Sequence, residues 1–66
     1  MSRFDYEQSK YMVALDYSFY ALIMAAMRQA DTQNLFLLRQ AFPDTWDELE
    51  ARYHAPGGLL PGESLP

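Results

Sequence analysis

Apolar residues recur at spacings of three and four from residue 4 to residue 55, and no stretch alternates strictly between apolar and polar positions. Spacings of three and four place side chains on one face of an α-helix, whereas alternation indicates a strand. Neither Asn-Gly nor Asp-Gly, the common hairpin turns, occurs in the chain. Proline and glycine are absent before Pro43 and gather between Pro56 and Pro66. We therefore predict an all-α fold, with one helical domain over residues 1–56 and a flexible tail over residues 57–66.

The first predicted helix begins near Ser2 and follows an apolar periodicity to about Ala30. Ser2 followed by Asp5 resembles a capping box, in which a serine side chain accepts a hydrogen bond from a backbone N–H of the first turn. The weakest point of the helix is the segment from Asp16 to Ser18, because aspartate and serine form alternative bonds to the backbone. The sequence therefore allows either a long continuous helix or one that is kinked or split near Ser18.

Two shorter helices are predicted after this segment. Asp31 or Thr32 is expected to cap a helix over about residues 33–41, which ends because Pro43 restricts the residue before it to extended geometry. Pro43 suits the first position of a last helix that ends near His54. Thr45 and Glu48 have the spacing of a second capping box.

The predicted first helix carries two apolar faces. One is a core-facing stripe, and the two short helices match it with their own apolar faces. The core is then expected to contain Leu15, Phe19, Leu22, Leu35, Leu38, Phe42, Trp46 and Leu49. The opposite face repeats at intervals of four and three, which is typical of contact with a neighbouring helix. This Tyr/Met face consists of Tyr6, Val13, Tyr17, Tyr20, Met24 and Met27, and Lys10 interrupts it.

Two short helices cannot cover both faces of a long one. We therefore predict that the Tyr/Met face is an interface between two copies of the chain, and that the protein is a homodimer. Tyrosine and methionine also suit protein interfaces, because they are amphipathic or adaptable. The alternative is a first helix that is buried on all sides within one chain, with its tyrosines at the rim of the core.

Composition supports a second buried surface. The chain has 66 residues, of which 50% are hydrophobic and 15% aromatic, and it has no cysteine that could form a disulfide or a thiolate metal site. A single core of this size rarely supplies more than about 3–5 kcal/mol. Oligomerisation is a remaining source of stability. The formal charge is −4 and the five cations are scattered, which argues against nucleic acid as a partner.

The N-terminal residues lack the basic start and apolar run of a signal peptide, and no run of apolar residues is long enough to span a membrane. We expect a cytoplasmic protein that does not interact with membranes.

The densest charge lies in the last predicted helix, at Asp44, Asp47, Glu48 and Glu50. Paired carboxylates can perform acid–base chemistry, but that needs a pocket that shifts a pKa, which so small a chain can hardly supply. We expect a solvated helix face or an acidic patch that engages a basic partner. His54 is the only histidine, so a zinc or iron site is not expected. No cofactor or catalytic residue is predicted, and we expect the protein not to be an enzyme.

The run from Tyr20 to Thr32, together with Ala41-Phe42-Pro43, Trp46, Glu48-Leu49 and Arg52-Tyr53, resembles small uncharacterised proteins encoded by bacteriophages and integrated mobile elements. The resemblance covers most of the chain but carries no motif of known chemistry. Small acidic proteins of such elements often bind a host or phage protein, including host defence complexes. The resemblance therefore implies an alternative function, in which the chain is an inhibitor or adaptor that binds a host protein through its acidic or Tyr/Met-rich surface.

Overall fold

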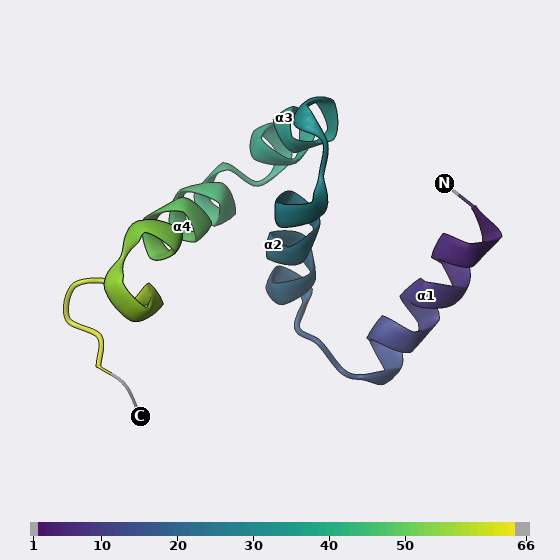
Figure 1. Cartoon of the computed structure of the whole chain (residues 1–66), viewed down its shortest axis with the longest axis horizontal. Coiled ribbons are helices and arrows are strands. Elements are labelled where there is room, and N and C mark those ends of the chain that lie inside the picture. The colour runs from purple at the N-terminus through teal and green to yellow at the C-terminus, as the bar shows by residue number, and fades with distance from the viewer. Residues whose placement is uncertain (1, 65–66) are drawn as a thin grey trace.

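The computed structural model describes residues 2–64, and within them every regular element is helical (Figure 1). The four α-helices are α1 (Arg3–Ala14), α2 (Phe19–Gln29), α3 (Thr32–Ala41) and α4 (Pro43–His54). A short 3₁₀ turn, η1 (Pro56–Gly58), follows α4. The predicted all-α class is confirmed.

The N-terminal segment is split into two helices. Ser18 is the N-cap of α2, and its Oγ accepts a hydrogen bond from the backbone N–H of Ala21 at 3.1 Å. Asp16, between the helices, has a φ of +59°, a left-handed conformation that no residue inside an α-helix adopts. Of the two alternatives that the sequence allows, the structure has a helix that is split near Ser18, and a continuous helix is excluded.

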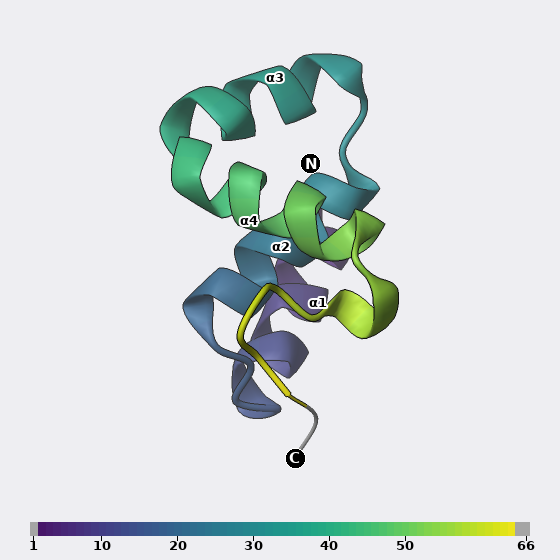
Figure 2. The same ribbon diagram turned by 90° about the vertical axis from the view of Figure 1, so that its left-hand side faces the viewer.

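Helices α2, α3 and α4 pack against one another, whereas α1 packs against none of them and lies apart from them in Figure 1. In Figure 2, α4 lies in front of α2, against which it packs. The rings of Phe19 and Phe42 meet edge to face with centroids 5.8 Å apart, which joins the start of α2 to the α3–α4 junction. The guanidinium of Arg39 lies 4.8 Å from the centre of the Trp46 ring, which joins α3 to α4. The two short helices thus cover α2 alone and leave α1 uncovered.

Local signals set the ends of the helices. Ser2 caps α1, and Asp31 caps α3 by accepting the N–H of Asn34 at 2.8 Å. Helix α4 begins at Pro43 without a side-chain cap, as a proline at the first position permits. The capping box predicted at Thr45 and Glu48 is wrong, because Thr45 already lies inside the first turn of α4.

After α4 the chain returns along the helix and is held there by Arg52. Its Nη1 donates to the Gly58 carbonyl at 2.8 Å and to Glu63 Oε1 at 2.7 Å, and its Nη2 donates to Glu63 Oε2 at 2.8 Å. Gly57 and Gly58 have φ values of +65° and +70°, which glycine adopts at no steric cost and which turn the chain back. The division of the chain at residue 56 and the mobility of the tail stay predictions, and residues 65–66 of that tail lie outside the described residues.

The core is small and centred on Met27, which is 3% exposed. Of the residues that the structure describes, Met27 is the one hydrophobic residue that is buried. It lies among half-buried side chains of α2, α3 and α4. Six of the predicted core residues are half-buried: Leu22, Leu35, Leu38, Phe42, Trp46 and Leu49. Leu15 and Phe19 are 66% and 57% exposed, so their assignment to the core is wrong. Both lie at the split, where the chain departs from the helical path on which their stripe depended.

The molecule is extended for its length. Its principal extents are 43 × 29 × 16 Å and its radius of gyration is 13.9 Å, against about 11 Å for a compact domain of this size. Its accessible surface is 5785 Å². A compact folded monomer of 7.7 kDa exposes about 4300 Å². The chain by itself leaves uncovered a large area that folded proteins ordinarily bury.

Candidate interaction surface

The six residues of the predicted Tyr/Met face lie on two helices and the turn between them. Tyr6 and Val13 belong to α1, Tyr17 lies in the turn, and the others belong to α2. The single helix with two continuous apolar faces does not exist, because the split interrupts both. Four of the six residues are well exposed: Tyr6, Val13, Tyr17 and Tyr20.

Met27 does not belong to an exposed face. It is buried against the chain's own α3 and α4, so its assignment to the interface is corrected. The physical reason is that α2 starts afresh at Ser18, and Met27 then lies beside Leu35 of α3 and Trp46 and Leu49 of α4. Met24, one turn earlier in α2, is half-buried and keeps an open side.

Tyr20 and Met24 line one side of a shallow hollow between α2 and α4. The other side is lined by Asp44, Thr45 and Glu48, and the hollow has a volume of about 270 Å³. Two candidate surfaces that the sequence placed on separate helices therefore meet here. We call these five residues the α2–α4 hollow. It combines apolar and phenolic side chains with two carboxylates.

The predicted acidic patch is divided between two sides of α4. Asp44 and Glu48 are one helical turn apart and face the α2–α4 hollow. Asp47 and Glu50 line a different depression with Ala51 and His54. At about 100° per residue, Asp44 and Glu48 lie about 40° apart around the helix, and the mean direction of Asp47 and Glu50 lies about 110° from theirs. Each pair presents its charge to a different direction of approach.

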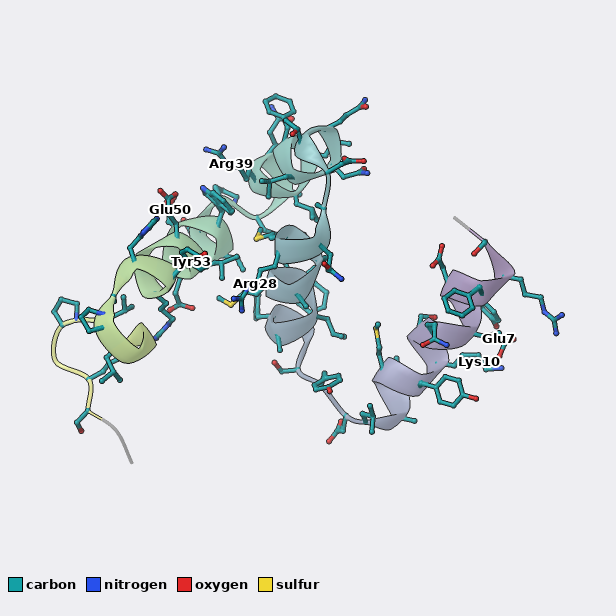
Figure 3. The ribbon with its side chains drawn as sticks, in the orientation of Figure 1. Glu7, Lys10, Arg28, Arg39, Glu50 and Tyr53 are labelled. Carbon is teal, nitrogen blue, oxygen red and sulfur yellow. The ribbon has the colours of Figure 1, made fainter. Side chains whose placement is uncertain are left out.

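A second groove lies between the C-terminal halves of α2 and α4. Its base and walls are mainly apolar, and its volume is about 470 Å³. Arg28 of α2 and Tyr53 of α4 approach each other across this groove (Figure 3), with the guanidinium 5.9 Å from the ring centre. Sequence reasoning missed this groove because Leu35, Trp46 and Leu49 were assigned to a closed core, and Met27 was assigned to the opposite face. The lining consists of Met27, Arg28, Leu35, Trp46, Leu49, Glu50, Tyr53 and His54.

Within residues 2–64, no three histidine or acidic side chains come together in a way that could hold a metal ion. His54 lies at the end of α4, beside Tyr53, with the two rings 5.4 Å apart. No described helix is both long enough and apolar enough to cross a lipid bilayer.

The clearest electrostatic perturbation lies where the C-terminal segment meets α4, at Arg52 and Glu63. Hydrogen bonds from Arg52, and then from the backbone N–H of Leu60, lower the pKa of Glu63 to about 2 from its ordinary value of 4.5. The pKa of Arg52 is raised, first by its hydrogen bond to Glu63. Any stability that this pair supplies is present above the ordinary pKa of Glu63 and is lost as the pH falls through about 2. The pair therefore serves to fasten the segment to α4.

Comparison with models of protein families, with curated proteins and with solved structures gives no match for this chain. The resemblance to proteins of phages and mobile elements gains no support from it and stays a prediction. The function is therefore inferred from the surface of the molecule.

Proposed function

We propose that the protein is a non-enzymatic interaction module that self-associates as a homodimer through the Tyr/Met face, now taken as Tyr6, Val13, Tyr17, Tyr20 and Met24. The observation that carries the proposal is the excess of exposed surface. The chain exposes 5785 Å², about a third more than a compact monomer of its mass. Each partner of a standard protein–protein interface buries about 800 Å², which is less than this excess.

The isolation of α1 supports the same proposal. An isolated helix of fewer than about 12–15 residues is marginal in water, because nucleation is costly and few hydrogen bonds follow it. Helix α1 has 12 residues and packs against no other helix of its own chain. A second copy that covers α1 would supply the packing that this helix lacks. Of the oligomers that a single chain forms, the two-fold dimer is the commonest.

Tyr20→Glu tests the proposal. Tyr20 is 58% exposed and is the second residue of α2, where a negative charge is favourable to the helix. The substitution should therefore leave α2 intact. In a dimer it places an unpaired charge in the interface, which costs several kcal/mol. We expect the variant to sediment as a monomer at concentrations where the unaltered protein is a dimer. Its far-UV circular dichroism spectrum should keep the helical signal of α2, α3 and α4 and lose at most the part contributed by α1.

Phe36→Glu is the matched control, because Phe36 is also a 58% exposed aromatic residue but lies on α3, outside the proposed interface. It should sediment as the unaltered protein does. Equal masses for the unaltered protein and the Tyr20→Glu variant would contradict the proposal.

The alternative function is that of an inhibitor or adaptor that binds a host protein. The observation that favours it is the α2–α4 hollow, where two carboxylates beside Tyr20 and Met24 suit a basic protein surface. In that case the unaltered protein is a monomer by sedimentation and gains mass only with the heterologous partner.

A further inference from the structure

We propose that the α2–α4 hollow of each copy receives helix α1 of the other copy, so that the dimer forms by reciprocal docking of α1. This inference rests on the proposed self-association and specifies its geometry. The occupant of the hollow is thus a second copy of the chain, and the contacting side of α1 is the one that carries Arg3, Tyr6, Lys10 and Val13. These four residues recur at intervals of three and four and share one face of the helix.

The charges of the two surfaces are complementary. The α1 face contains both cations of the first helix, Arg3 and Lys10, beside two exposed apolar or phenolic side chains. The hollow contains Asp44 and Glu48 beside Tyr20 and Met24. Each surface therefore offers the other an opposite charge and an apolar contact. Such complementarity fixes the register of an interface more than its strength.

The direction in which Lys10 points favours a second molecule over the chain's own hollow. Lys10 and Glu7 lie on the side of α1 turned away from α2 (Figure 3). The Lys10 ammonium is 3.4 Å from Glu7 Oε2, and the two side chains are 59% and 40% exposed. A partly exposed pair of this kind contributes little and is easily exchanged. The described chain leaves this face of α1 open to an approaching partner.

The ion pair that Glu48 makes within its own chain leaves this carboxylate accessible to a second copy. Glu48 Oε1 lies 3.7 Å from Arg52 Nη2, which is a long ion pair, whereas Arg52 is held at 2.7 and 2.8 Å by Glu63. Replacing Glu48 therefore leaves Arg52 fastened. Asp44 is a less suitable position for substitution, because it lies in the first turn of α4 and stabilises the positive end of that helix.

The test exchanges the charges between two separate chains. Lys10→Glu brings two carboxylates together in both contacts of its homodimer, and Glu48→Lys brings two ammonium groups together in both. We expect each variant alone to dimerise about tenfold more weakly or worse, because each repeats the unfavourable contact twice.

Mixing the two variants restores opposite charges to both contacts. In the heterodimer, one contact pairs the introduced carboxylate of one chain with the introduced ammonium of the other, and the second contact pairs the unaltered Lys10 with the unaltered Glu48. The mixture should therefore form a heterodimer of near-normal affinity, which native mass spectrometry resolves by mass.

Glu50→Lys is the matched control, because it makes the same change of charge on α4 but outside the hollow. It should dimerise as the unaltered protein does, and it should not rescue Lys10→Glu on mixing. A loss of α1 helicity in the Lys10→Glu variant could weaken the homodimer by itself, but mixing would not reverse that loss.

The outcomes separate this inference from the proposed function. Suppose that the unaltered protein is dimeric. If both variants also dimerise normally, or if the weakened variants do not associate on mixing, the reciprocal docking of α1 is overturned and self-association remains. An unaltered protein that is monomeric at every concentration overturns both the self-association and the reciprocal docking. The same holds if α1 docks on the α2–α4 hollow of its own chain, because such a protein is a monomer. The inference is supported if each variant alone dimerises weakly and the mixture forms a heterodimer of near-normal affinity.

Discussion

At the scale of single residues, the packing of the three-helix unit depends on Met27. Its side chain is 3% exposed, while the residues around it from α3 and α4 are only half-buried. An unbranched thioether adapts to such an irregular space better than a branched side chain does. The same residue had the spacing of an interface position in the sequence. Its burial shows that a chain this small has few apolar side chains to place at its centre.

Met27→Ala should be strongly destabilising. Removing a buried methionine side chain costs about 2–5 kcal/mol, which is comparable with the whole stability of about 3–5 kcal/mol available to a core of this size. We expect the urea midpoint to fall steeply, or the variant to be largely unfolded without denaturant. Met12→Ala is the control, since Met12 is 46% exposed on α1. Similar midpoints for the two variants would remove Met27 from the centre of the fold.

At the scale of elements, the separation of α1 from α2 decides which faces the chain can cover. Ser18 caps α2, Asp16 turns the chain with its left-handed φ, and α1 then projects away from the other helices (Figure 1). An uncovered helix of this length needs contacts from outside the chain to be stable. The helicity of α1 should therefore depend on association, whereas that of α4 should not.

Amide hydrogen exchange measures this dependence for each helix. In the unaltered dimer, amides of residues 3–14 should be protected, and in the Tyr20→Glu variant they should exchange nearly as fast as an unfolded peptide. Amides of α4 should be protected in both proteins, because α4 packs against α2 and α3 within one chain. Equal protection of α1 in both proteins would show that its helix does not need the partner.

Much of this organisation could be predicted from local signals in the sequence. The caps at Ser2 and Asp31, the proline start of α4 and the weak point near Ser18 are signals of a few residues, and each operates in the structure as expected. The faces could not be predicted in the same way. Helical periodicity carried across residues 15–18 assumes a straight axis, and the turn at Asp16 removes the phase between the two halves. Leu15 and Met27 were misassigned for this reason.

The candidate site shows the same division. Exposure of Tyr6, Val13, Tyr17 and Tyr20 agrees with the sequence pattern, although their joint use as an interface stays a prediction. The meeting of Tyr20 and Met24 with Asp44 and Glu48 could not be read from spacing, because it depends on how α4 crosses α2.

At the scale of the whole molecule, the proposed self-association depends on one comparison: the chain contains more hydrophobic residues than its own helices bury. Half of the residues are hydrophobic, yet the single chain spans 43 Å and packs only three of its four described helices together. Large exposed apolar areas on soluble proteins usually mark sites of association. Reciprocal docking of two α1 helices would cover the isolated helix and the α2–α4 hollow in one step.

Sedimentation equilibrium of the unaltered protein over a wide range of concentrations tests this self-association most directly. We expect a mass of twice the 7.7 kDa chain at high concentration, which falls to that of one chain on dilution. A mass of one chain at every concentration would contradict it.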